Sequence, residues 1–422
     1  MTELYDAVSE SMPFEERKRY IDRKAAEIVA YAYKNSPGFQ ERLDRAGVKP
    51  SDIKSLKDLE KIPVLSKSEL LNMQRAKPPF GGLLSTTTKS LKTVFVSPGP
   101  LYDAVDVPET MRILCKTFFA AGLRKGDVAI NSFSYHLVPA GLLLHQGLQK
   151  LGVTVIPAGT GNSELQAQVM REMGVTCYVG TPSFLKTLID RVKELGFEFQ
   201  RDLKLKRAIL TGEMLAPSLR QFFQNDYGIA VFQVYGTGDL GVVAYECRQK
   251  AGMHIPEEVI VEIVDPATGK QLPSGETGEL VVTSLNRIYP LVRFGTGDLS
   301  LFTDESCPCG RTSNRLVRIA GRIGDAVKVR GMFIHPRQLE EAISRTGGIR
   351  NFQLVVSRRE QRDEMTLKLE VEDASADKER LIESLQSNVR EICKLRIDSV
   401  DFVPCGTIPK ERKIISDERK WE

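Results

Sequence analysis

Short apolar runs alternate with amphipathic segments of helical length through residues 127–212, and this alternation limits the fold more than any other feature. The apolar runs read VAINSF, VTVIPAG, VTCYVGTP and KRAILTG, and the helical segments between them cover residues 137–151, 163–173 and 183–195. Strands joined by helices of this length predict a mostly parallel sheet with helices on both faces. Ligand sites in such sheets lie at the carboxyl ends of the strands. We therefore expect function at residues 133–135, 159–161, 180–182 and 211–213.

The flanking sequence predicts the rest of an α/β fold. Residues 14–46 have helical periodicity that Ser36-Pro37-Gly38 interrupts, and residues 259–294 are rich in strand-forming runs. After Arg322, two helices and three strands predict a small α+β domain. We expect a large N-terminal domain over residues 1–321, with helix-covered, mostly parallel sheets plus a strand-rich subdomain. The small C-terminal α+β domain is expected over residues 322–422.

Composition excludes several classes of protein. The net charge of +4 is small for 422 residues, and no basic tract carries interleaved aromatic residues, so we expect no nucleic-acid partner. No run of about 18 apolar residues occurs, which predicts no membrane span. The N-terminus is polar and lacks an apolar signal core. Seven cysteines in so long a chain form no disulfide framework, and their odd number favours a reducing, cytoplasmic location.

An ordered series of motifs runs from Phe294 to Pro336. It opens with FGTGDL, expected to be a glycine turn that presents the Asp298 carboxylate between two strands. Cys-Pro-Cys follows, then Gly-Arg-Ile-Gly-Asp at residues 321–325, then Val-Lys-Val-Arg-Gly and a new helix after His335. The order of these motifs resembles the linker of acyl-adenylate-forming (AMP-binding) ligases, and in particular the phenylacetate–CoA ligase branch.

This resemblance implies an enzyme, an ATP-dependent, AMP-forming acid–CoA ligase that acts on an aryl or arylacetic acid through an acyl-adenylate. The expected partners are a small carboxylic acid, ATP with Mg²⁺, and coenzyme A. By analogy with relatives, we also expect a homodimer. Residues 322–422 would be mobile, with a hinge near residues 322–325. Two alternatives stay open: an adenylyltransferase or carrier-loading enzyme of the same superfamily, or a nucleotide-binding relative that has lost catalysis.

The resemblance also assigns roles to individual residues. Asp239 would help hold magnesium, and Lys413 would be the adenylation lysine, with Lys410 in reserve. Tyr135 and Val138 would line the acyl pocket. The nucleotide would contact Gly212, Glu213, Tyr235, Gly236, Thr237, Asp298 and Arg322.

Three cysteines and one histidine form a candidate metal set. Cys247 and His254 follow the Tyr-Gly motif, and Cys307 and Cys309 lie about 50 residues later in Cys-Pro-Cys-Gly. Three thiolates and one imidazole suit a tetrahedral structural Zn²⁺ site. The alternative is three ordinary thiols and a surface histidine.

The phosphate loop departs from the family pattern. Relatives have a Ser/Thr/Gly-rich run ending in Gly-Lys-Pro, whose amides and hydroxyls hold phosphates. Here the corresponding stretch reads Ser97-Pro98-Gly99-Pro100, which lacks the lysine and loses two N–H donors to proline. Either the phosphates are held from elsewhere, or activity on ATP is altered or lost. In the linker, Gly324 stands where relatives have aspartate, a change that hinge motion should tolerate.

Overall fold

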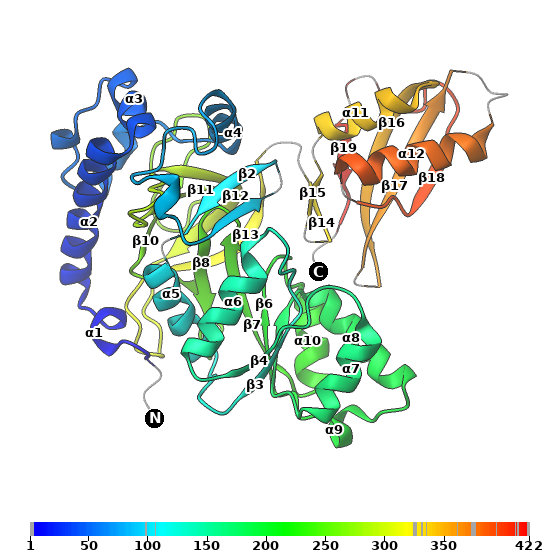
Figure 1. Ribbon diagram of the computed structural model, residues 1–422, viewed down its shortest axis with the longest axis horizontal. Helices are drawn as coiled ribbons and strands as arrows, with labels where there is room; N and C mark the ends of the chain where they lie inside the picture. Colours follow the sequence, from blue (N-terminus) through cyan, green and yellow to red (C-terminus); the bar gives the residue numbers. More distant parts are fainter. Residues whose placement is uncertain are drawn as a thin grey trace. The chain divides into compact units, whose positions relative to one another are not determined.

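The chain divides into two compact units. The computed structural model describes residues 4–97, 99–105, 107–323, 327–330, 332–334, 336–360, 362–372, 377–393, 395–409, 411 and 413–419. The large unit comprises residues 1–215 and 220–321, and the small unit comprises residues 216–219 and 322–422. Both units mix helices with sheets, so the predicted fold class is confirmed (Figure 1).

One sheet of eleven strands organises the large unit. Its order is β10-β11-β12-β13-β9-β8-β7-β6-β5-β3-β4. The predicted alternation produces its parallel part, in which every neighbouring pair runs in the same direction. The strands of that part are β3 (Val128–Asn131), β4 (Thr154–Ile156), β5 (Cys177–Gly180), β6 (Arg207–Leu210) and β7 (Ala230–Thr237).

Helices cover both faces of this parallel part. Helix α6 (Pro139–Lys150) connects β3 to β4, whereas α7 (Ser163–Glu172) and α8 (Pro182–Glu194) carry the chain back across the sheet. Because parallel crossovers are right-handed, α6 lies on one face and α7 and α8 lie on the other. Helix α5 (Val107–Ala120) packs beside α6, and the buried core contains leucine side chains from both helices and Phe118 from α5.

The strand-rich segment joins the same sheet through antiparallel pairs. Strand β8 (Gly241–Glu246) pairs with β7, and β9 (Met253–His254) pairs with β8. Strands β10 (Val259–Val264), β11 (Gly278–Ser284), β12 (Phe294–Thr303) and β13 (Arg315–Arg322) complete it. The sequence predicted a glycine turn at residues 294–299, and this was wrong, because they lie inside β12. Gly295 stands opposite Val281 of β11, and cross-strand pairing overrides the local turn preference.

The N-terminal segment packs on the sheet through four helices and a hairpin among the described residues. Residues 14–46 form two helices, α2 (Phe14–Asn35) and α3 (Pro37–Arg45), as the interruption predicts. Helix α1 (Ala7–Glu10) precedes them, and α4 (Lys67–Ala76) begins at an N-cap, Ser66, whose hydroxyl accepts from a backbone amide. The hairpin of β1 (Val94–Ser97) and β2 (Leu101–Ala104) follows. A buried aliphatic and aromatic cluster joins α2, α3 and α4 to β10 and β12.

The remaining helical elements are short, and one of them, which begins at Pro217, includes residues of both units. They are α9 (Phe199–Asp202), α10 (Pro217–Gln221), η1 (Pro50–Asp52), η2 (Lys57–Lys61), η3 (Thr88–Ser90) and the π-helical η4 (Phe222–Asp226). Among the helices of the described residues, none is long and apolar enough to cross a membrane.

The small unit is a four-stranded sheet with two helices. Its order is β18-β17-β16-β19, with a separate hairpin of β14 and β15. The strands are β14 (Val327–Val329), β15 (Met332–Ile334), β16 (Ile349–Arg359), β17 (Arg362–Val371), β18 (Ser399–Phe402) and β19 (Ile415–Asp417). Helices α11 (Pro336–Thr346) and α12 (Lys378–Cys393) pack together. Leu385, Val389 and Cys393 of α12 are buried in its core.

Candidate functional site

The parallel strands deliver the predicted polar loops to one end of the sheet. Strands β3, β5, β6 and β7 are neighbours that run in the same direction, so their carboxyl ends lie at the same edge (Figure 1). The loops that leave this edge contain residues 132–138, 181–183, 211–213 and 238–240. This is the edge at which ligands bind in open parallel sheets.

Tyr235 and Asp298 are joined directly. Tyr235 lies near the end of β7 and Asp298 lies within β12, and the tyrosine hydroxyl donates a hydrogen bond to Asp298 Oδ2 at 2.8 Å. Each residue is only 8% exposed. The backbone amide of Asp298 also donates to the hydroxyl of Thr296, and this bond holds the backbone from which the carboxylate extends. Two residues with predicted nucleotide contacts, 63 positions apart, therefore form one hydrogen-bonded pair.

Gly212 and Glu213 follow β6 and contact the start of α8. The Glu213 carboxylate accepts from the Ser183 amide at 3.3 Å and from the Ser183 hydroxyl at 2.9 Å. A carboxylate at a helix N-terminus is stabilised by the helix dipole, so these bonds hold the loop against α8. Gly212 has a φ of +86°, and a Cβ there would lie 3.5 Å from the Phe133 ring. The sheet thus brings residues 212–213 beside the loop that follows β3.

Gly236 and Thr237 end β7, and Asp239 lies in the turn that leads to β8. The Thr237 hydroxyl accepts from the Leu240 amide at 3.2 Å, and a Cβ at Gly236 would lie 2.5 Å from the Gly241 carbonyl oxygen. Only glycine fits that close approach. Asp239 Oδ2 forms an ion pair with Lys67 at 3.2 Å, although the aspartate side chain is only 2% exposed.

The Lys67–Asp239 ion pair and the Ser97–Asp103 contact of the β1–β2 hairpin are features of this region that the sequence did not reveal. Lys67 begins α4, and 172 residues separate it from Asp239, so no local pattern connects the two. In the hairpin, the Ser97 hydroxyl donates to Asp103 Oδ2 at 2.5 Å, and both residues are buried. Ser97, the first residue of the altered phosphate loop, therefore ends β1 and donates its hydroxyl to a buried carboxylate.

Tyr135 and Val138 lie in the loop between β3 and α6, and both are partly buried. The Tyr135 hydroxyl accepts from the buried Asn131 amide at 3.0 Å and lies 3.2 Å from His145 Nδ1. Burial raises the pKa of Tyr135 to about 12. Because the hydroxyl already contacts both Asn131 and His145, the ring of Tyr135 is its remaining contact surface. Val138 is the N-cap residue of α6.

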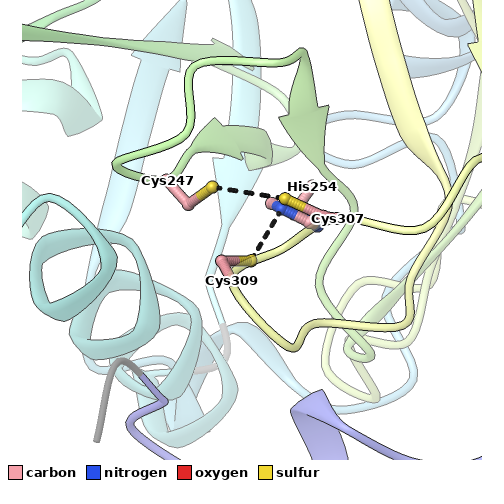
Figure 2. A group of neighbouring side chains, drawn as sticks. All are labelled: Cys247, His254, Cys307 and Cys309. Atoms are coloured by element: carbon pink, nitrogen blue, oxygen red, sulfur yellow. Dashed lines mark hydrogen bonds between the residues drawn. The ribbon is translucent and has the colours of Figure 1, made fainter.

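Cys247, His254, Cys307 and Cys309, here called the Cys3His cluster, are brought together by the fold (Figure 2). Their ligand atoms all lie within 4.8 Å of one another, and all four residues are buried. Cys247 Sγ is 3.7 Å from Cys307 Sγ, and Cys309 Sγ is 3.4 Å from His254 Nε2. Burial lowers the pKa of His254, which favours the neutral imidazole that binds metals.

Two loops and one short strand supply this cluster. Cys247 follows β8, His254 ends β9, and both remaining cysteines lie in the loop between β12 and β13. His254 Nδ1 lies 3.3 Å from the Ser313 hydroxyl, which orients the ring. In the same loop, Arg311 forms a buried ion pair with Glu10 at 2.7 Å, so the loop also holds the N-terminal segment.

The remaining predicted residues belong to the small unit. Lys413 is exposed and precedes β19, and its carbonyl oxygen accepts from the Gln353 side chain at 3.0 Å. Arg322 is the last residue of β13 and is partly buried. Gly324 and Asp325 of the predicted hinge, and the reserve Lys410, lie outside the described residues.

Comparisons with known proteins agree with this arrangement. Residues 117–286 match the family described as AMP-binding enzyme, and residues 331–419 match the AMP-binding enzyme C-terminal domain. The chain is 32% identical over 383 residues to the phenylacetate-coenzyme A ligase of Thermus thermophilus, covering 88% of this chain and 85% of that protein. It is 30% identical over 401 residues to the Escherichia coli phenylacetate-coenzyme A ligase, covering 90% of each.

A solved structure extends the similarity to almost the whole chain. It is 2-hydroxyisobutyryl-CoA ligase in complex with 2-HIB-AMP and CoA, with a TM-score of 0.92, 25% identity, and coverage of 99% of this chain and 93% of that one. The chain therefore belongs to the AMP-binding enzyme family. Within that family it is an AMP-forming acid–CoA ligase of the phenylacetate–CoA ligase type, with a divergent phosphate loop. The predicted family and enzyme class are confirmed.

Proposed function

We propose that the enzyme activates an aryl or arylacetic acid. The observation that carries this proposal is the fixed aromatic side chain of Tyr135, whose hydroxyl is already hydrogen-bonded to Asn131 and His145. The ring would then present an apolar face to the acid, and the Phe133 ring, which lies in the same loop beside Gly212, supports this proposal. Apolar and aromatic side chains suit an aryl group, whereas a hydroxy acid needs polar partners for its hydroxyl.

The reaction proceeds in two balanced steps. In the first, a carboxylate oxygen of the acid attacks the α-phosphorus of ATP, the bond to the β-phosphate oxygen breaks, and pyrophosphate leaves. In the second, the sulfur of CoA attacks the acyl carbonyl, the thiol proton is lost, and AMP leaves with the electrons of the acyl–oxygen bond. Both steps need positive charge where negative charge develops on the phosphate and carbonyl oxygens.

The nucleotide would be held by residues of the large unit. Asp298, oriented by Tyr235, would accept from the ribose hydroxyls, and Gly212-Glu213 would flank the adenine, supported by the hydrogen bonds that hold this loop against α8. Gly236 and Thr237 would lie at the α-phosphate. Asp239 would help hold Mg²⁺ on the phosphates, and its Oδ1 atom fits that role, since it is buried with no hydrogen-bond partner among the described residues.

The small unit would supply the charge for adenylation. We propose that Lys413 approaches the phosphate during the first step, because its side chain is exposed. Residues 322–422 would move as a mobile domain between the two steps, about a hinge near residues 322–325 that begins at Arg322. The predicted homodimer stays a prediction.

The Cys3His cluster would hold a structural zinc ion. For Zn–S bonds of about 2.3 Å and a Zn–N bond of about 2.0–2.1 Å, a tetrahedral site places two sulfurs roughly 3.8 Å apart and a sulfur and a nitrogen roughly 3.5 Å apart. The observed separations are 3.7 Å and 3.4 Å. Four protein ligands leave no open position, so the ion would join the β8–β9 loop to the β12–β13 loop without taking part in the reaction.

The acid is tested by measuring CoA thioester formation with a panel of acids. We expect phenylacetate, benzoate or indoleacetate to give the highest kcat/KM, and 2-hydroxyisobutyrate and short aliphatic acids to give lower values. Replacing Tyr135→Leu should lower kcat/KM for the aryl acid more than for a short acid. A preference for a hydroxy acid, or an equal loss for both acids in the variant, would refute the aryl assignment. AMP attached to the product, with no requirement for CoA, would indicate an adenylyltransferase.

A further inference from the structure

A buried glutamine on α7 connects two of the loops at the carboxyl edge of the parallel sheet. Gln166 lies in the first turns of α7 and is only 3% exposed. Its amide group offers one carbonyl oxygen and two N–H donors, and each is costly to leave unpaired at a buried position. The carbonyl oxygen accepts one hydrogen bond and the amide nitrogen donates two, and all three partners belong to loops outside α7.

The carbonyl oxygen of this amide holds the loop that follows β3. The Ser132 hydroxyl donates to Gln166 Oε1 at 2.7 Å, and Ser132 is itself buried. Ser132 directly precedes Phe133, and its other neighbour, Asn131, donates from its side chain to the Tyr135 hydroxyl at 3.0 Å. Gln166 therefore fixes the backbone from which both aromatic side chains of the proposed acid site extend.

The amide nitrogen holds the loop that follows β4. Gln166 Nε2 donates to the Gly159 carbonyl oxygen at 3.0 Å and to the Gly161 carbonyl oxygen at 2.7 Å. Gly159, Gly161 and Asn162 have φ values of +69°, +76° and +47°, in the left-handed region. A strand ladder cannot continue through such residues, so the path of this loop depends on side-chain donors.

One amide group thus sets the spacing between two loops that leave the sheet side by side. Strands β3 and β4 are parallel neighbours, so the loops after them emerge at the same edge (Figure 1). The residues with proposed nucleotide contacts in the large unit follow β6, end β7 or lie in β12 and β13. The loops that Gln166 joins are therefore on the acid side of the proposed site.

We propose that Gln166 is a positioning residue that fixes the two loops and thereby determines which acids fit between them. It would act through Ser132 and the two glycine carbonyl groups, rather than by touching the acid. The inference rests on the proposed function, since it takes Phe133 and Tyr135 as walls of the acid site. Loss of the amide would leave three buried polar groups unpaired, and the loops would then move apart to reach water.

The first test measures CoA thioester formation by Gln166→Met, a side chain of similar length without the polar amide. We expect the KM for the preferred acid to rise at least about fivefold and the KM for ATP to change less than about twofold, since only the acid side is displaced. Discrimination against an acid one methylene longer should also fall. Gln168→Met, on the same helix at a partly exposed position, is the control and should behave like the wild type.

The second test measures backbone hydrogen exchange by mass spectrometry on the full chain without substrates. Gln166→Met should speed exchange in residues 132–136 and 157–162 and leave residues 211–213 unchanged, whereas Gln168→Met should alter none of them. Ser132→Ala should speed exchange in the first loop, and combined with Gln166→Met it should add less than the sum of the separate effects, because the two residues share one hydrogen bond.

Three results would overturn the proposal. They are unchanged exchange in both loops, an equal increase in exchange throughout the large unit, and equal increases in the KM values for acid and ATP. A wild-type enzyme that activates no acid would refute the proposed function and, with it, the selection of acids by Gln166. The exchange measurement needs no substrate, so it separates that failure from a failure of Gln166 to hold the loops.

Discussion

Substitution of Cys309 by alanine should remove the zinc ion and destabilise the large unit. The ion would connect Cys247 to Cys307, which are 60 residues apart. Closing a loop of that length removes unfolded-chain entropy equivalent to about 4 kcal/mol by the relation used for disulfides. We therefore expect Cys309→Ala to lower the free energy of unfolding by about that amount, as well as to abolish stoichiometric zinc.

The measurement combines elemental analysis with urea unfolding followed by circular dichroism, on protein purified without chelator. Cys177→Ala is the matched control, since Cys177 is a fully buried thiol outside the Cys3His cluster. It should keep its zinc and lose about 1 kcal/mol, the cost of truncating a small buried side chain. Equal destabilisation in the two variants, or a wild-type protein without zinc, would refute the metal site.

Three further predictions follow from the contacts of single side chains. Tyr235→Phe removes the 2.8 Å hydrogen bond to Asp298 and should weaken ATP binding, measured by calorimetry, by up to about tenfold, equivalent to about 1.4 kcal/mol. Asp298→Ala should bind ATP more weakly still. Unchanged ATP affinity in both variants would show that the pair does not contact the nucleotide. Lys413→Ala should slow adenylation far more than thioester formation from supplied acyl-AMP, whereas Lys368→Ala should slow neither; equal losses in both steps would contradict the assigned role. Lys116→Met leaves the buried Glu257 and Glu258 without their shared ammonium partner and should lower the free energy of unfolding in urea by about 3–5 kcal/mol. An unchanged free energy of unfolding would show that the charge of the two glutamates is compensated by other groups.

The elements that repeat a simple period were predictable from the sequence. The alternating apolar runs at residues 128–212 became the parallel strands and their covering helices, because burial on both faces selects that pattern. The Cys3His residues could also be grouped by spacing, since few side chains share that chemistry. Their 3.7 Å and 3.4 Å separations, however, depend on how two loops pack, which no spacing fixes.

Contacts between distant segments could not be predicted. Residues 294–299 were predicted to form a turn, since two glycines favour turns locally, but their pairing with β11 places them in a strand, in which Gly297 keeps a positive φ of +72°. The Lys67–Asp239 ion pair spans 172 residues and carries no sequence signal. Asp103 follows the divergent loop closely in the sequence, and only the pairing of β1 with β2 buries it beside Ser97.

The central claim is that this chain forms acyl-adenylates despite its altered phosphate loop. The most direct test is exchange of labelled pyrophosphate into ATP, measured with and without each acid of the panel. The account predicts exchange that depends on the acid, is highest with an aryl or arylacetic acid, and does not require CoA. Absence of exchange with every acid, while the protein still binds ATP, would contradict it and would indicate a nucleotide-binding relative without this catalytic activity.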